Sequence, residues 1–283
     1  MIDLHSHILP AIDDGAADLD MALVMARMAV ADGVRVQACT PHILPGLYHN
    51  SGPDIRAHVA ALQQALNEND IPLHLVTGAD VHICPDFVAG LRDGRYLTLA
   101  DTRYVLVEPP HNTAPARLED LFASIQAAGY VPILTHPERL KWIRSHYPLM
   151  ERLTATGVWM QITTGSLTGA FGREPLYWAE RMLDEGAVHI LASDAHNTDR
   201  RPPNMRAGYE CASVRVGESE ARHLVETRPM GILQNVAPQD LPLPVRHVKP
   251  SRGRAASART SSGGDGAGLF SSVTRGVRRL IKH

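Results

Sequence analysis

Residues 2–7 read IDLHSH, a short apolar run that ends in the alternating histidines His5 and His7. Side chains two positions apart on an extended segment point to the same side, so both imidazoles can reach one metal ion. Alone, such a pair is weak evidence, because polar residues often end a strand. The segment gains weight because the same arrangement, a short apolar run followed by polar residues, recurs along the chain.

Short apolar runs alternate with longer segments of helical period through residues 1–245. The helical segments include residues 19–31 and 55–66. The predicted strands are residues 2–4, 34–39, 73–77, 104–107, 131–134, 158–162 and 189–191. Alternation of this kind predicts a parallel sheet with crossover helices, and the number of repeats favours a closed barrel over an open sheet.

Histidines and carboxylates directly follow several of these strands, at the end where a parallel barrel presents its active-site loops. They are Thr40-Pro41-His42 after the second strand, Glu108 after 104–107, Thr135-His136-Pro137 after 131–134, and Ser193-Asp194-Ala195-His196 after 189–191. Unrelated core histidines would not choose this position repeatedly, so the sequence predicts a multinuclear metal site. Mixed imidazole and carboxylate ligands suit manganese, iron or zinc better than calcium.

Six segments, in chain order, resemble the PHP (polymerase and histidinol phosphatase) superfamily: HSHILPAIDDGA, TPH, GAD, VEPP, THPER and SDAH. Within it, they are most similar to the bacterial tyrosine phosphatases of capsule and exopolysaccharide synthesis. The likeness extends to about residue 240 and leaves out the basic end of the chain. It implies a distorted (β/α)7-type barrel that holds three divalent ions, usually manganese, with iron or zinc as alternatives.

The resemblance also implies which histidines and carboxylates bind each ion. Grouped by ion, they are His5, His7, Glu108 and Asp194 for the first, Glu108, His136 and Asp80 for the second, and Asp14, His42 and His196 for the third. Asp80 departs from the family pattern, in which a longer Glu is expected after Gly-Ala. Its direct ligation therefore stays open, with a water molecule as an alternative, and Asp13 competes with Asp14 for the third ion.

The metal site predicts a hydrolase that acts on a phosphoester. Clustered cations lower the pKa of a bridging water, and the resulting hydroxide can attack phosphorus in line while the ions neutralise phosphate oxygens. Arg139, in THPER, is predicted to clamp the phosphate through its planar guanidinium, and Arg206 is a second candidate; either could instead form a surface ion pair. Asp14 and His196 are candidates to donate a proton, although a phenol leaving group of pKa about 10 needs little help.

Composition bounds the class of protein. The chain has 283 residues, of which 44% are hydrophobic and 20% charged, values typical of a globular protein with one large domain. The cysteines Cys39, Cys84 and Cys211 lack CxxC spacing, and none precedes an arginine by six residues, so neither a disulfide framework nor a phosphocysteine intermediate is predicted. No signal peptide or membrane-spanning run is evident, which predicts a cytoplasmic protein.

The charge changes sign along the chain. Residues 246–283 hold nine Lys or Arg against one acid, Asp265, whereas residues 1–245 hold 19 basic and 29 acidic residues. We therefore divide the chain into a domain at 1–245 and a basic tail at 246–283. Residues 251–268 have a disordered composition, and residues 269–282 could form a basic amphipathic helix that contacts an anionic membrane or a partner. A frayed terminus would explain the same residues.

The leading functional prediction is a protein-tyrosine phosphatase acting on the tyrosine-rich tail of a bacterial autokinase of polysaccharide export. One alternative is a small-molecule phosphoesterase such as a histidinol phosphatase, and another is a non-catalytic scaffold that keeps the metals for structure. Nucleic acid is not an expected partner, because the body of the chain is acidic. The loop at residues 45–52 could contact a peptide or be an ordinary turn. Most other histidines, including His82 and His111, are expected to be surface or capping residues.

Overall fold

Parallel strands form the centre of the computed structural model, which describes residues 1–246. One sheet has the order β1-β2-β5, with β1 (Ile2–Asp3), β2 (Val36–Cys39) and β5 (His74–Thr77). The other has the order β10-β9-β8-β7-β6-β3-β4. Its strands are β3 (His42–Leu44), β4 (Tyr48–His49), β6 (Asp80–His82), β7 (Tyr104–Glu108), β8 (Val131–Thr135), β9 (Trp159–Thr163) and β10 (Ile190–Ala192). Every strand pair is parallel except β3 with β4, so the predicted α/β class is confirmed.

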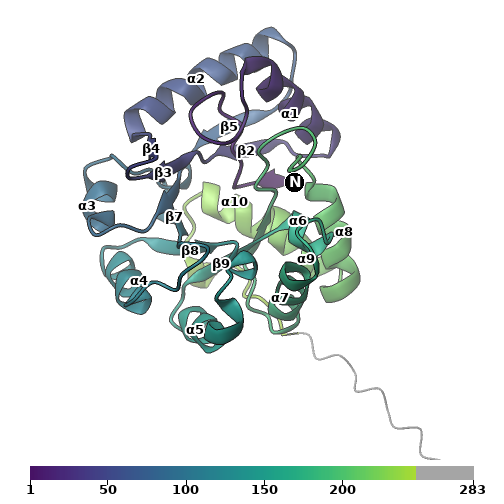
Figure 1. The fold of residues 1–283 in the computed structure, drawn as a ribbon. Helices are drawn as coiled ribbons and strands as arrows, with labels where there is room; N and C mark the ends of the chain where they lie inside the picture. The colour runs from purple at the N-terminus through teal and green to yellow at the C-terminus, as the bar shows by residue number, and fades with distance from the viewer. Residues whose placement is uncertain (247–283) are drawn as a thin grey trace, which may run out of the picture. The chain divides into compact units, whose positions relative to one another are not determined.

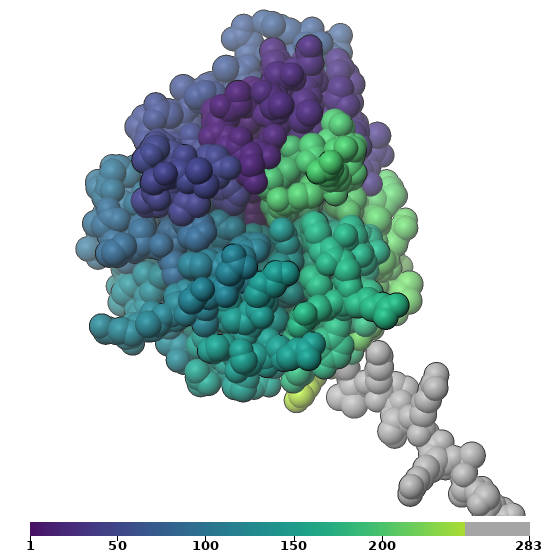
Figure 2. Space-filling view, viewed as in Figure 1, coloured from purple at the N-terminus to yellow at the C-terminus, as the bar shows by residue number. Residues whose placement is uncertain are grey.

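The two sheets together make a distorted barrel. Strand β2 pairs with β5 in the first sheet, and the chain continues directly into β3, which pairs with β6 in the second. The barrel closes where the first strand meets the last: the backbone N–H of His7 donates to Ala195 O at 2.9 Å, and that of Asp194 donates to His5 O at 2.9 Å. The segments beyond β1 and β10, coloured purple and green, lie side by side at this seam (Figure 2).

The predicted strands 34–39 and 73–77 are shorter than expected, and three strands were not predicted. Each of these two predicted strands, observed as β2 and β5, is followed by a break and then by a second short strand, β3 after β2 and β6 after β5. Pro41 lies in the first break and cannot donate a ladder hydrogen bond. Gly78 lies in the second, where a Cβ would stand 3.0 Å from the side chains of Thr40 and Leu99. These breaks turn the chain from one sheet to the other and account for the distortion.

Helices surround the strands (Figure 1). They are α1 (Leu19–Ala31), α2 (Gly52–Glu68), α3 (Phe87–Arg92), α4 (Leu118–Ala127), α5 (Ile143–Ala155), α6 (Thr164–Leu167), α7 (Arg173–Asp184), α8 (Met205–Val216), α9 (Glu218–Arg222) and α10 (Arg228–Leu233). Asp18 caps α1 by accepting a hydrogen bond from Met21 N. The two helical segments predicted at 19–31 and 55–66 are confirmed as α1 and as part of α2. Within residues 1–246, no helix is both long and apolar enough to cross a membrane.

The segment after α10 is tied to the barrel by a buried arginine. The Arg228 side chain is fully buried; its Nε donates to Pro242 O at 2.6 Å and its guanidinium pairs with Glu220 at 2.8 Å. It also donates to the carbonyl of His189 at 3.3 Å, at the start of β10. The ring of His189 is itself buried against Trp159, with centroids 4.9 Å apart. The predicted tail helix and disordered stretch lie outside the described residues.

Candidate metal centre

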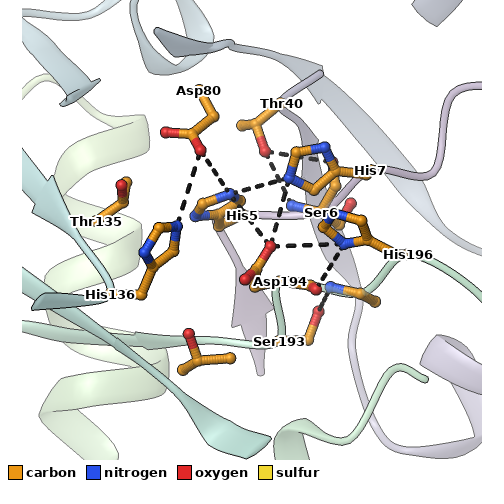
Figure 3. Close-up of polar contacts among 12 residues, drawn as sticks. His5, Ser6, His7, Thr40, Asp80, Thr135, His136, Ser193, Asp194 and His196 are labelled. Carbon is orange, nitrogen blue, oxygen red and sulfur yellow. Dashed lines mark hydrogen bonds and ion pairs between the residues drawn. The ribbon is translucent and has the colours of Figure 1, made fainter. Parts of the chain in front are cut away.

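Histidines and carboxylates from both sheets converge at the carboxyl end of the barrel. The close-up shows the side chains of His5, His7, Asp80, His136, Asp194 and His196 pointing toward one another (Figure 3). His5 and His7 follow β1, His136 follows β8, and Asp194 and His196 follow β10. Parallel topology brings these positions together because all the strands end on the same side. The residues named in the sequence analysis as ligands therefore share one site.

His5 and His7 face each other through their Nε2 atoms, which are 3.2 Å apart. Their other ring nitrogens are engaged: His5 Nδ1 lies 2.8 Å from Gln161 Oε1, and His7 Nδ1 lies 2.7 Å from Asp13 Oδ2. Because both acceptors are oxygens, each Nδ1 is the donor, so protons or a cation can be held only at the Nε2 atoms. A cation between the two Nε2 atoms would take the place of a proton there. Asp194 Oδ1 lies 3.5 Å from His5 Nε2 and 3.4 Å from His7 Nε2.

Glu108, the last residue of β7, lies between three imidazoles. Its Oε1 is 3.6 Å from His136 Nε2 and 3.3 Å from His111 Nε2, and its Oε2 is 3.2 Å from His42 Nδ1. Asp80 Oδ2 lies 3.9 Å from His136 Nε2 and 3.6 Å from His42 Nδ1. Burial favours the neutral acid, but His111 and His42 hold the pKa of Glu108 well below its usual range. The short Asp80 side chain thus reaches the same group of nitrogens.

Asp14 completes a third group with His42 and His196. Its Oδ1 lies 3.5 Å from the Nε2 atom of each histidine. Asp13 instead makes hydrogen bonds within the protein. Its carboxylate accepts from the backbone N–H of His42 at 3.0 Å and of Gly15 at 2.9 Å, and also from the His7 ring. The structure therefore places Asp14 rather than Asp13 where a ligand of the third group would stand.

The buried donor atoms of this site fit a set of cations. Both carboxylate oxygens of Asp80, Asp194 Oδ1, His42 Nδ1 and His196 Nε2 are buried and make no hydrogen bond. Leaving such atoms unsatisfied is costly, so natural proteins rarely do so without a ligand. Subsets of these residues place one donor atom each within 4.8 Å of one another. Nitrogen and oxygen donors without thiolates suit manganese, iron or zinc.

Opposite charges inside the site shift the pKa values of His5 and Asp194. Burial disfavours a charged ring, yet Asp80 and Asp194 raise the pKa of His5 to about 9. Burial also opposes ionisation of Asp194, but the Arg201 guanidinium and His5 hold its pKa well below the usual range. The carboxylates that favour a proton on His5 would equally favour a divalent cation. Binding such a cation would then displace protons from the site.

Two other imidazoles of the site, His136 and His196, have lowered pKa values. Burial and the nearby Arg139 lower the pKa of His136 well below its usual value. Burial and His7 lower the pKa of His196 to about 4. A neutral imidazole offers a lone pair, which is the form that binds metal.

Two arginines stand at the edge of the site. Arg139 and Arg201 each contact Asp194 Oδ2, and both line a cavity of about 250 Å³ beside the clustered donors. The turn that carries Arg139 is fixed by its buried neighbour Glu138, whose Oε1 accepts hydrogen bonds from Thr163 N at 2.9 Å and Ser166 Oγ at 2.7 Å. The guanidinium groups of Arg139 and Arg201 are thus positioned to contact an anion in the cavity.

Arg206 does not take part in this site, which corrects the prediction that it contacts phosphate. It lies in the first turn of α8, and its guanidinium lies over Gly33, in a hollow that Met1 and Arg35 also line. These residues precede or begin the first two strands, so Arg206 is at the opposite end of the barrel from the clustered donors. Arg201, which was not singled out from the sequence, lines the cavity together with Arg139.

The roles of several residues of the site were not predicted from the sequence. Asp13 and Gln161 hold ligand rings by hydrogen bonds, and such a role leaves no distinctive spacing. His111 was expected to be a surface or capping residue, but it lies 3.3 Å from Glu108. Its position three residues after Glu108, in VEPPH, was the available signal. His82, also dismissed, lies 3.7 Å from Glu108 Oε2.

Comparison with known proteins gives consistent matches over most of the chain. The model of the family described as capsular polysaccharide synthesis, CpsB/CapC, matches residues 1–234. Tyrosine-protein phosphatase YwqE of Bacillus subtilis is 35% identical over 249 residues, which cover 88% of this chain and 98% of that protein. Putative tyrosine-protein phosphatase CapC of Staphylococcus aureus is 32% identical over 202 residues, covering 71% of this chain and 79% of that protein.

Solved structures agree with these matches. One, described as YwqE from Bacillus subtilis and CpsB from Streptococcus pneumoniae, unique metal-dependent tyrosine phosphatases, superposes with a TM-score of 0.81 at 36% identity. The match covers 87% of this chain and 99% of that one. A 2-pyrone-4,6-dicarboxylic acid hydrolase from Acinetobacter baumannii, at 15% identity and a TM-score of 0.52, shares the fold alone.

Proposed function

Because the chain belongs to the CpsB/CapC family of capsular polysaccharide synthesis, we propose that it is a metal-dependent phosphatase that hydrolyses phosphotyrosine in proteins. One observation carries this proposal: unsatisfied histidine and carboxylate donors converge beside a cavity that is also lined by Arg139 and Arg201. Cations and guanidinium groups on the same cavity suit a phosphate, which carries negative charge on several oxygens.

Three divalent ions, most simply manganese, are proposed to occupy the three donor groups. His5, His7, Glu108 and Asp194 would hold one ion, Asp80 and His136 would share a second with Glu108, and Asp14, His42 and His196 would hold the third. When bound, such ions activate a water molecule for attack on phosphorus and neutralise phosphate oxygens. Asp13 and Gln161 keep the His7 and His5 rings turned toward the site.

Arg139 and Arg201 are proposed to orient the phosphate. Each side chain is largely buried, and both reach the same Asp194 oxygen, so their positions are fixed before substrate arrives. The tyrosine oxygen leaves with a pKa of about 10, which reduces the need for a general acid. Asp14, at the cavity wall, and its neighbour His196 are the candidates that would supply a proton together with metal-bound water.

A protein segment is a better substrate for this site than a small buried molecule. The Asp14 side chain is 47% exposed and that of His111 is 32% exposed, so the cavity opens to solvent. We propose that the physiological substrate is the phosphorylated tail of a tyrosine autokinase in the cytoplasm. The free thiols of Cys39, Cys84 and Cys211 support a reducing compartment.

The basic residues 246–283 are proposed to form a separate tail that contacts anionic membrane surfaces. Support comes from their composition, nine Lys or Arg against one acid, following a domain of net negative charge. Such contact would keep the enzyme near a membrane-associated substrate.

The decisive experiment measures hydrolysis of a phosphotyrosine peptide and of histidinol phosphate by metal-stripped protein before and after manganese is restored. We expect turnover of the peptide only with metal. Arg139→Lys and Arg201→Lys, which keep the charge but lose the planar fork, should each lower kcat/KM by about 100-fold. Arg206→Lys is the matched control. Its kcat/KM should stay within about twofold of wild type, because the Arg206 guanidinium does not line the cavity and cannot donate to a phosphate bound there.

Metal content measured by mass spectrometry must accompany each variant, because Arg139 and Arg201 also contact the ligand Asp194. A loss of activity with unchanged metal content assigns the effect to the phosphate. Preference for histidinol phosphate would overturn the protein-phosphatase proposal in favour of a small-molecule phosphoesterase. Folded, metal-loaded protein that hydrolyses neither compound would point to a scaffold.

A further inference from the structure

The cavity beside the clustered donors offers no apolar wall. Its lining consists of polar and charged residues: Asp14, His42, Glu108, His111, His136, Arg139, Asp194 and Arg201. This lining suits cations and a phosphate. The phenyl ring of a phosphotyrosine is apolar and packs best against an aliphatic or aromatic surface. The ring must therefore find its surface outside the cavity, at the rim.

The β3–β4 hairpin places such a surface at the rim. His42 lines the cavity and begins β3, and the chain then turns back into β4 at the edge of the sheet (Figure 1). The Tyr48 ring stacks on the His42 ring, with centroids 5.6 Å apart and planes 16° from parallel. Its neighbour Leu47 is 63% exposed, so its aliphatic side chain is open to contact from solvent. The Tyr48 ring thus stands beyond the His42 wall of the cavity, and Leu47 precedes it at the turn of the hairpin.

The hairpin is held in place by its own hydrogen bonds. The Asn50 side chain donates to His42 O at 2.8 Å and to Ile12 O at 3.0 Å, which ties the returning strand to the start of β3. The Leu47 N–H donates to Leu44 O at 3.0 Å and closes the turn. A surface that is already ordered loses little entropy when a ligand packs on it.

The other aromatic ring near the cavity is already in use. Phe171 carries the guanidinium of Arg139 over its face, 4.4 Å from the ring centroid. Tyr48 is only partly covered, and its ring contacts the wall residue His42 rather than one of the arginines. Of these two rings, Tyr48 is the one placed to receive a substrate ring.

We infer that Tyr48 and Leu47 form the binding surface for the aromatic ring of the substrate, and so determine preference for aryl over alkyl phosphoesters. This inference rests on the proposed phosphatase function and adds the residues that recognise the phenyl group. The Tyr48 hydroxyl has no part in it, because the ring face supplies the contact.

Binding can be measured without turnover. Manganese-loaded protein is titrated by calorimetry with phenylphosphonate, which carries a ring, and with inorganic phosphate, which does not. For Tyr48→Leu we expect phenylphosphonate to bind about 2- to 10-fold more weakly, the usual effect of losing one aromatic pair, while phosphate binding is unchanged. Leu47→Ser should give a smaller change of the same kind, and Tyr48→Phe is the matched control that keeps the ring.

Kinetics on a phosphotyrosine peptide separate this inference from the proposed function. Wild type should turn over the peptide, and Tyr48→Leu should raise KM with little effect on kcat. If wild type turns over the peptide but Tyr48→Leu leaves the ratio of the two dissociation constants unchanged, the inference is wrong while the function stands. Equal weakening of both ligands would also overturn it, since Tyr48 would then act through His42 on the metal site. Absence of turnover by wild type would instead count against the function.

Discussion

Histidine serves two opposite purposes in this chain. In the candidate metal centre, carboxylates surround the rings and His5 has a raised pKa. At the start of β10, His189 is buried with no carboxylate beside it, and burial together with Arg228 lowers its pKa to about 3. Its Nδ1 accepts the backbone N–H of Met160 at 3.1 Å, which requires an unprotonated nitrogen. The first environment attracts positive charge and the second excludes it.

His189 predicts acid sensitivity of the fold. An unfolded histidine has a pKa of about 6.5, so between the folded value of about 3 and this value only the unfolded chain binds the proton. The contribution is fully present above about pH 6.5 and is lost as the pH falls, by about 2 kcal/mol at pH 5. We expect His189→Asn, which keeps an acceptor for Met160, to flatten the fall in unfolding free energy between pH 6.5 and 4.5, measured by urea denaturation.

Acid also weakens metal binding, so the slopes must be compared between variants in one metal buffer. His58→Asn, at an exposed position on α2, is the control and should follow wild type. A slope in His189→Asn as steep as in wild type would show that other groups govern the acid response.

At the scale of residues, the candidate metal ligands that belong to a sequence motif could be predicted. The residues that hold those ligands in place by hydrogen bonds could not. His5, His7, Glu108 and His136 stand at strand ends, and the strand pattern places them in space. Arg201 reaches Asp194 through a loop whose path no periodicity encodes. Arg206 was a second, weaker candidate, and the sequence could not exclude it because position along the chain does not reveal which end of a barrel a side chain reaches.

At the scale of elements, α10 is coupled to β10 through Arg228. Removing its side chain by Arg228→Met leaves the Glu220 carboxylate buried without its partner and frees two carbonyls. We expect a loss of about 3–5 kcal/mol in the free energy of unfolding, measured by denaturant titration. The double variant Arg228→Met with Glu220→Leu should recover part of that loss, because the isolated charge is gone. If the double variant is as unstable as the single one, the lost carbonyl contacts and not the charge are responsible.

The longer strands and helices α1 and α2 were predictable because their hydrophobic patterns extend over enough residues to show a period. The unpredicted strands β3, β4 and β6 are as short as β1 and β10, but each follows another strand after a short break and not after a helix. Such lengths carry no periodicity, and pairing with neighbours far along the chain decides them. The breaks that precede β3 and β6 were also not predicted from the sequence, although Pro41 lies in the first and Gly78 in the second.

At the scale of the whole chain, charge divides the molecule into an acidic part and a basic one, about −10 over residues 1–245 and +8 over residues 246–283. If the basic residues contact a membrane, protein ending at Arg246 should lose binding to vesicles that contain anionic lipid. Each basic residue near such a surface contributes about 1 kcal/mol, so the full chain should bind strongly and release in high salt. Cosedimentation measures this, and hydrolysis of a phosphotyrosine peptide in solution should be equal for both proteins. Equal vesicle binding by the two would sink the membrane proposal.

The seam between the first strand and the last has a consequence for biosynthesis. His5 and His7 are synthesised almost two hundred residues before Asp194, which lies within 3.5 Å of both in the folded chain. A nascent chain therefore cannot assemble the complete donor set until β10 has been synthesised and has closed against β1. Translation itself delays the moment at which this protein can capture its metals, so an unfinished chain carries no working hydrolase.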